Sequence, residues 1–163
     1  MSEPSAELPA GARALASESV ASTASAVPVG PQAFANVPFS NVPFARLIGL
    51  QREFSQGGRA RLVLEPRPEL ENMVQSTHGG VVATLLDVAM ASAAISLRDF
   101  QVTAITLDMH CQFLRPGRGR LTADGEVLAC EGETALCRAR VSDPQGELVA
   151  QAQGSFRYRD KTR

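Results

Sequence analysis

The sequence has little excess charge, no closely paired cysteines and few histidines. Lysines and arginines number 16 against 17 acidic residues, so the formal net charge is -1 and gives no overall attraction to nucleic acid or to an anionic membrane. A nucleic-acid-binding protein usually presents a clustered basic face, whereas the arginines here are scattered except for Arg115, Arg118 and Arg120. The composition therefore argues against nucleic acid and membrane as partners.

The three cysteines, Cys111, Cys130 and Cys137, form no CxxC pair, and only two histidines accompany them. This is poor material for a zinc site, and we expect neither a metal nor another cofactor. We expect reduced cysteines that act as small core hydrophobes, which suits a reducing, cytoplasmic location. Cys130 and Cys137 fall on neighbouring strands, but a turn at Glu131-Gly132 places them out of register, so no disulfide is expected.

The first part of the chain, residues 1–33, is rich in Ala, Ser, Pro and Glu and has few large apolar residues. Such a segment buries too little surface to offset its ordering entropy, so we expect a disordered tail. It also lacks the basic start and uninterrupted apolar stretch of a signal peptide. Residues 34–160 are enough for one domain with a core.

Local patterns predict the elements of this domain. Pro43 suits the first turn of a short helix at 44–48, which Gly49 ends. Alternating apolar positions and turn residues predict strands on both sides of a long helix. They fall at 50–55, 59–65, 105–113, 121–130, 134–142 and 148–158. The layout is α+β: an antiparallel sheet of about six strands wrapped around one central helix, with four consecutive strands after the helix.

The long helix, residues 79–97, is apolar nearly all round and has no internal proline, which is typical of a central buried helix. A membrane span is the alternative, because about 20 apolar residues suffice to cross a bilayer. Asp87 in mid-segment and the many small residues argue against a span.

Asp87 carries the most information about chemistry. A carboxylate among Leu85, Leu86 and Val88 is costly unless it is paired or functional. The alternative is a thin solvent-facing stripe on the helix, shared with Ser92.

The triplet His78-Gly79-Gly80 stands at the start of the same helix. A helix start exposes unpaired amides with partial positive charge, and glycine lets a substrate oxygen approach them closely. Oxyanion sites are built in this way. An ordinary glycine-rich helix start is the alternative.

Gly79 and Asp87 are eight residues apart in the sequence, which corresponds to about 12 Å along a helix axis. One carbonyl cannot contact the helix start and also lie near a water held by Asp87 of the same chain. Antiparallel pairing of two such helices would bring the start of one to the middle of the other. We therefore expect a homodimer with two shared sites.

Together these residues resemble a known family. Asn72, then His78-Gly79-Gly80 six residues on, Asp87 nine residues beyond His78, and finally Thr106-Leu107-Asp108-Met109 are similar to the hotdog-fold acyl-CoA thioesterases, and among them to the PaaI-type group of phenylacetic acid degradation. The resemblance covers roughly residues 41–158. It implies hydrolysis of acyl-CoA to free acid and CoA.

The resemblance also implies roles for single residues. The Gly79 amide would polarise the thioester carbonyl, Asn72 would hold that carbonyl or orient the site, and His78 would lie beside the thioester. Asp87 of the partner subunit would activate water as general base, or act as nucleophile. Asn72 could instead cap a turn, and His78 could simply bond to the backbone at the helix start.

Thr106 falls where relatives carry a Ser or Thr that orients the water. By strict alternation, however, it shares a face with Asp108 and His110, away from a helix covered by Ile105 and Leu107, unless a bulge intervenes. The alternative for Thr106 is a β-branched strand former, and His110 is interpreted as a strand-surface residue.

Three arginines, Arg115, Arg118 and Arg120, could bind the phosphates of CoA, although an arginine-rich loop is usually just solvated. Two rival functions remain: a non-catalytic acyl-CoA-binding or sensing hotdog protein, and a hotdog hydratase or dehydratase acting on acyl thioesters. The carboxylate and the spacing favour a thioesterase. The acyl group, and the choice between a dimer and a pair of dimers, stay open.

Overall fold

The structure, a computed structural model, describes residues 42–160. The expected tail, 1–33, and the first part of the expected domain, 34–41, lie outside this range. The described chain contains two α-helices, one 3-10 turn and six strands. They are α1 (Pro43–Ile48), β1 (Leu50–Gln56), β2 (Arg59–Leu64), η2 (Pro68–Leu70), α2 (Gly79–Ser96), β3 (Val102–Phe113), β4 (Leu121–Glu131), β5 (Thr134–Ser142) and β6 (Leu148–Asp160).

The short first helix begins and ends as its sequence predicts. Proline occupies its first turn, and Gly49 ends it with φ 75°, a left-handed conformation that glycine adopts without a Cβ penalty. The Gly49 amide donates back to the carbonyls of Ala45 and Arg46. This closed end turns the chain directly into β1.

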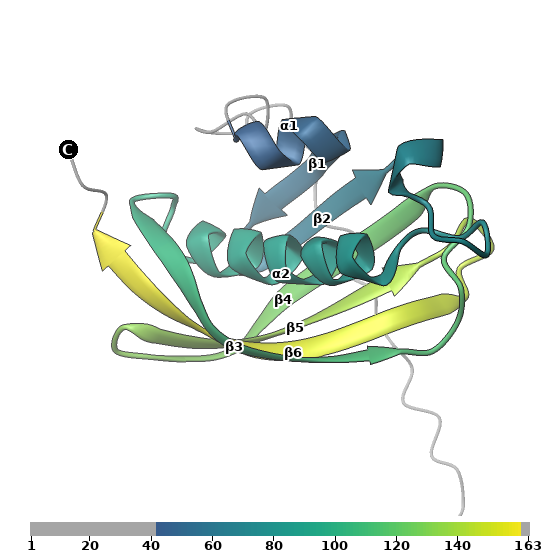
Figure 1. Cartoon of the computed structure of the whole chain (residues 1–163). Helices are drawn as coiled ribbons and strands as arrows, with labels where there is room; N and C mark the ends of the chain where they lie inside the picture. The colour runs from purple at the N-terminus through teal and green to yellow at the C-terminus, as the bar shows by residue number, and fades with distance from the viewer. Residues whose placement is uncertain (1–41, 161–163) are drawn as a thin grey trace, which may run out of the picture.

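The six strands form one antiparallel sheet in the order β1-β2-β4-β5-β6-β3 (Figure 1). The expected α+β class and strand number are confirmed. The four strands after the helix are antiparallel neighbours, as expected, although they do not pair in sequence order. Strand β3 pairs with β6 at the far edge, and not with β4, because α2 carries the chain across the sheet before β3 begins. The two edges are therefore β1 and β3.

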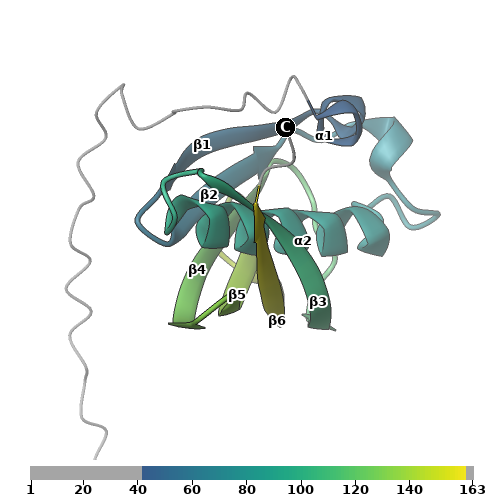
Figure 2. The ribbon, with the colours of Figure 1, turned by 90° about the vertical axis from the view of Figure 1, so that its left-hand side faces the viewer.

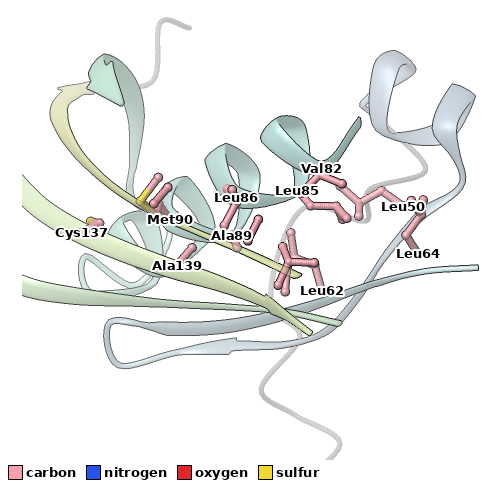
Figure 3. Close-up of a cluster of buried hydrophobic side chains, with 14 of the residues drawn as sticks. Leu50, Leu62, Leu64, Val82, Leu85, Leu86, Ala89, Met90, Cys137 and Ala139 are labelled. Atoms are coloured by element: carbon pink, nitrogen blue, oxygen red, sulfur yellow. The ribbon is translucent and has the colours of Figure 1, made fainter. Parts of the chain in front are cut away.

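Helix α2 lies across the concave face of the sheet, as two perpendicular views show (Figures 1 and 2). Its sheet-facing side chains meet those of the strands in one core, where Leu62, Leu85 and Leu86 are fully buried (Figure 3). At Gly125 of β4 an added Cβ would lie 2.3 Å from the carbonyl oxygen of Ala89. The helix backbone thus rests directly on the strand, an approach that only glycine permits.

The helix is not buried all round, contrary to expectation. Gly80 is exposed, and a line of residues on the same side is only half-buried. We call this line the open stripe; it consists of Thr84, Asp87, Val88, Ala91 and Ile95. Ser92 is not part of it, because it is buried. By length and composition α2 could cross a membrane, but half of it is buried inside the fold, as in a core helix.

The cysteines depart in part from the expected pattern. Cys137 is fully buried and Cys111 half-buried, but Cys130 is exposed; it lies at the end of β4, where the helix no longer covers the sheet. In register, Cys130 faces Ala135 and Cys137 faces Val127. The two thiols are therefore not directly opposite, as predicted, and all three cysteines are free.

Burial has an electrostatic consequence at this end of the sheet. It raises the pKa of the Cys137 thiol from 9.0 to about 12, with Cys130 adding to the shift. Burial likewise raises the pKa of the Tyr158 hydroxyl from 10.0 to about 12. That hydroxyl donates to the Ala94 carbonyl at 3.0 Å and so ties β6 to α2. Both groups stay protonated in the folded chain after the unfolded chain has lost their protons.

We predict that stability falls as pH rises from about 9 towards 12, because the unfolded chain releases the Cys137 proton there and the folded chain holds it. The contribution is complete below pH 9 and is lost as pH approaches the folded pKa, with a slope of up to about 1.4 kcal/mol per pH unit and group. In Cys137→Ala the part due to Cys137 should be missing, while the parts due to Tyr158 and to Cys111, whose thiol pKa is also raised, should remain. Urea unfolding of both chains at about pH 8 and about pH 11 measures the difference; equal pH slopes would contradict the prediction.

Candidate active site

The start of α2 has one backbone amide without a hydrogen-bond partner in the described part of the chain. His78 caps the helix: its Nδ1 accepts from the Gly80 amide at 2.9 Å, and its carbonyl accepts from the amides of Val81 and Val82. The Gly79 amide has no hydrogen-bond partner among residues 42–160. Of the four amides that this helix start leaves open, those of Gly80, Val81 and His78 itself, which donates to the Leu70 carbonyl, are therefore satisfied, and that of Gly79 can bind a substrate oxygen.

The cap also defines the state of the His78 ring. Because Nδ1 accepts a hydrogen bond, the neutral ring carries its proton on Nε2. The residue as a whole is exposed. The helix-capping alternative for His78 is therefore correct as a description of its contacts, and it leaves Nε2 as a further donor beside Gly79.

Asn72 organises the loop that leads to the helix. Its Oδ1 accepts from the amides of Val74 and Ser76, and its Nδ2 donates to the Ser76 hydroxyl at 3.0 Å. These bonds hold a tight turn in which Gln75 has φ 55°. Within one chain Asn72 is thus a turn-capping residue, and it shapes the approach to His78.

Asp87 and Thr106 meet across the gap between α2 and β3. The Thr106 hydroxyl donates to Oδ1 of Asp87 at 2.7 Å, and the other carboxylate oxygen has no partner among the described residues. The contact exists because β3 has a bulge: Thr106 pairs with Phe156 and Asp108 with Ser155, which leaves Leu107 unpaired.

The bulge corrects the expected face of β3. Before it, even-numbered residues such as Ala104 and Thr106 face the helix; after it, the odd-numbered Met109 and Cys111 do. Ile105 and Leu107, which were expected to cover the helix, are about half exposed, at 51% and 50%. Strict alternation is wrong for this strand, because one extra residue shifts the side-chain pattern by one.

Cys111 is a neighbour of the carboxylate that the sequence did not single out. Burial raises the pKa of the Cys111 thiol, and the negative charge of Asp87 raises it further. The thiol therefore stays neutral beside Asp87 and does not compete with it as a base. The only signal in the sequence was the alternation of β3, which the bulge obscures.

Within one chain the two halves of the candidate site stay apart. An added Cβ on Gly79 would lie 3.9 Å from the ring of Phe113, at the end of β3, whereas Asp87 contacts Thr106 near its middle. The helix between them is unbroken, so they are about 12 Å apart along its axis. The structure brings together Asp87 and Thr106 on one side, and Asn72, His78 and Gly79 on the other.

The three arginines near the end of β3 differ in their partners. Arg115 pairs with Glu147, and Arg120 pairs with Glu53 at 2.6 Å and with Glu65 at 3.4 Å. Arg118 makes no ion pair or hydrogen bond within residues 42–160. It follows Gly117, whose carbonyl accepts from the Thr77 amide at 2.8 Å. As far as the described residues go, Arg118 is therefore the unpaired arginine of the loop that touches the start of α2.

His110 is exposed on β3, opposite Gln153, as expected for a strand-surface residue. Within the described range, no three His, Cys, Asp or Glu side chains gather where they could hold a metal ion.

A single long helix held in a six-stranded antiparallel sheet is the architecture of the hotdog fold. The model of the thioesterase superfamily matches residues 75–150. The medium/long-chain acyl-CoA thioesterase YigI of Salmonella typhimurium is 30% identical over 132 residues, which cover 71% of this chain and 85% of the relative. YigI of Escherichia coli is 29% identical over the same length.

Solved structures agree. The E. coli PaaI protein of the phenylacetic acid degradation operon is similar with a TM-score of 0.70 and 26% identity, over 76% of this chain and 89% of that one. A conserved protein of Pseudomonas aeruginosa gives 0.68 and 27%, over 71% and 93%. The chain therefore belongs to the thioesterase superfamily, as a hotdog-fold protein of PaaI type, and thioester hydrolysis is its general activity.

Proposed function

We propose that this protein hydrolyses acyl-CoA thioesters to the free acid and CoA, with Asp87 activating the attacking water. The observation that carries the proposal is the state of the Asp87 carboxylate. One oxygen is oriented by the Thr106 hydroxyl at 2.7 Å, and the other has no partner among residues 42–160. An acceptor that is held in place and has an open lone pair suits a general base.

In the proposed reaction the thioester carbonyl points at the amide of Gly79. Water attacks the carbonyl carbon while its proton moves to Asp87, and the negative charge that develops on oxygen is stabilised by the Gly79 amide. The carbon–sulfur bond then breaks, and the proton passes to the departing CoA sulfur. His78 Nε2 supplies a second donor beside the carbonyl, and Asn72 keeps the loop in shape.

The two halves come, in this proposal, from two copies of the chain. Two neighbouring surfaces that no other described residue covers support this dimer. They are the open stripe of α2 and the edge of β3 that has no partner strand among the described residues. Four large apolar side chains of β3 and its end are at least half exposed: Ile105, Leu107, Phe113 and Leu114. A strand edge with apolar side chains invites pairing with another copy. We propose a homodimer with two shared sites, and a pair of such dimers as the larger assembly.

The substrate's two ends meet different surfaces. Arg118, unpaired and next to the loop that precedes His78, is the arginine best placed to bind a CoA phosphate. The acyl chain would lie along the apolar part of the open stripe, at Val88, Ala91 and Ile95. Because two relatives are named medium/long-chain acyl-CoA thioesterases, we propose acyl groups of that length as substrates.

Replacing Asp87 with asparagine tests the reaction. The amide oxygen can still accept from Thr106, but it cannot take a proton from water, so kcat should fall about 10²- to 10⁴-fold. Thiol release from a panel of acyl-CoAs of different lengths measures this. Wild-type turnover by Asp87→Asn on every good substrate would overturn the assignment. Acyl-CoA binding without thiol release by the wild-type protein would favour the non-catalytic rival.

Replacing Gly79 with proline tests the oxyanion donor. Proline is well tolerated at the first position of a helix, and His78 already has φ -57° and ψ 138°, which a residue before proline favours. The change removes one N–H that has no hydrogen-bond partner among residues 42–160. We expect kcat to fall about 10²- to 10³-fold, with little change in the unfolding temperature.

The matched control for this experiment is Gly79→Ala. It keeps the amide, and its Cβ would stand 3.9 Å from the Phe113 ring, an ordinary contact. Its kcat should therefore stay close to that of the wild type. Equal losses in the alanine and proline variants would show that crowding, and not the missing amide, is responsible.

A mixed dimer tests whether the site is shared. Chains carrying Asp87→Asn and chains carrying Gly79→Pro should each have little activity alone, but a dimer of one of each would have one site with both changes and one site with neither. Mixed dimers isolated through two different tags should recover about half of the wild-type activity. Absence of recovery in such a purified dimer would place both groups in one chain.

A further inference from the structure

The bulge in β3 stands directly beside the Asp87–Thr106 contact. Thr106 is the last residue before the unpaired Leu107, and its hydroxyl lies 2.7 Å from the carboxylate. A bulge bends its strand and increases the local twist, which re-aims the neighbouring side chains. The position of the Thr106 hydroxyl therefore depends on how the bulge is held against β6.

On the helix side, the bulge is accommodated by a missing side chain. Gly154 of β6 pairs with Met109, just after the bulge, and it is buried. An added Cβ there would lie 2.7 Å from the backbone carbonyl oxygen of Asp108. That is closer than carbon and oxygen can approach, so any side chain at this position would push the β3 backbone away. The same Cβ would be 3.5 Å from Met90 of α2, which is an ordinary distance.

On the outer side, the bulge is held by a hydrogen bond. The Ser155 hydroxyl donates to Oδ2 of Asp108 at 2.5 Å, and the two residues are partners in the strand register. Gly154 and Ser155 are adjacent and point to opposite faces of the sheet. Gly154 therefore leaves room for the bulge on the helix side, and Ser155 holds it by a hydrogen bond on the solvent side.

We propose that Gly154, with the Ser155–Asp108 pair, is a positioning element that holds Thr106 on Asp87. Neither Gly154 nor Ser155 touches the reacting atoms; both act through Asp108, two residues from Thr106, Gly154 on its backbone and Ser155 on its carboxylate. The inference rests on the proposed function of Asp87 as the base. It adds that the orientation of this base is set by β6, a strand that contributes no side chain to the site.

The test is a double-mutant cycle on kcat. Thr106→Val keeps the shape of the side chain and removes a hydrogen bond to a carboxylate, so it should lower kcat about 10- to 100-fold in the wild-type background. Gly154→Ala alone should lower kcat by a similar factor with KM changed less than about twofold, because it displaces the same hydroxyl. In the Gly154→Ala background, Thr106→Val should then cost at most about threefold.

Two further variants separate positioning from general damage. Leu62→Val removes buried volume on β2, far from the bulge, and should lower the unfolding temperature while leaving kcat and the effect of Thr106→Val unchanged. Ser155→Ala removes the hydrogen bond to Asp108 without adding bulk. It should lower kcat by less than Gly154→Ala does, and it should reduce the effect of Thr106→Val on kcat in part. It keeps the test decisive where Gly154→Ala fails to fold.

The outcomes distinguish this proposal from the proposed function. Full activity of Asp87→Asn would show that Asp87 is not the base, and the positioning inference, which depends on that assignment, would then also be wrong. An inactive Asp87→Asn, combined with independent, multiplying effects of Thr106→Val and of both β6 variants, would leave the function standing and overturn the positioning role. The same holds if Thr106→Val in the wild-type background leaves kcat unchanged.

Discussion

The contact between the backbone of α2 and strand β4 governs much of the molecule. At Gly125 the Ala89 carbonyl lies where a Cβ would be only 2.3 Å away, so the helix is as close to the sheet as two backbones allow. This contact fixes the height and the rotation of the helix together. Because Ala89 faces the sheet, Asp87, two residues earlier, must face away from it, since successive helical residues are about 100° apart. The carboxylate is therefore on the open stripe for a reason of packing.

The same rotation decides what β3 must do. Strand β3 lies at the sheet edge beside the open side of α2, so it is the strand that can reach Asp87. To do so it must present a hydroxyl at one point and still pack Met109 and Cys111, both partly buried, against the core further along. Regular alternation cannot meet both demands with this sequence, and the bulge at Leu107 meets them. Gly154 of β6, which has no side chain, leaves the space that the bulged backbone of β3 needs.

The sequence predicts well wherever the cause is local. Pro43 and Gly49 set the limits of α1, turn residues separate β4 from β5, and an unbroken apolar run produces α2. Asp87 also stood out locally, because a carboxylate is costly in apolar surroundings. The general class of fold and the resemblance to thioesterases followed from these features.

What the sequence could not predict arises from contacts between distant segments. The pairing of β3 with β6 joins segments about 50 positions apart in the chain, and no residue of β3 signals its partner. The bulge depends on Gly154 and Ser155, which look like ordinary strand residues until the register is known. The His78 cap depends on a ring orientation, and the pairing of Arg120 with Glu53 depends on a fold that brings β1 close to the loop before β4. Each of these changes the interpretation of a site residue without changing the fold.

The open stripe finally connects packing to chemistry. In a single chain, Asp87 has water on one side, which weakens any electrostatic effect that it exerts. In the proposed dimer a second copy would cover the stripe, and water would be excluded from the carboxylate while Thr106 continued to hold one oxygen. The partner would bring the amide of its own Gly79, whose neighbours Gly80, Val81 and Val82 are already satisfied by His78. The apolar residues of the open stripe would then serve two purposes, because they would contribute to association and also exclude water from the carboxylate. Such a site is complete only when the second chain is present, which ties activity to assembly through the same few residues of α2 and β3.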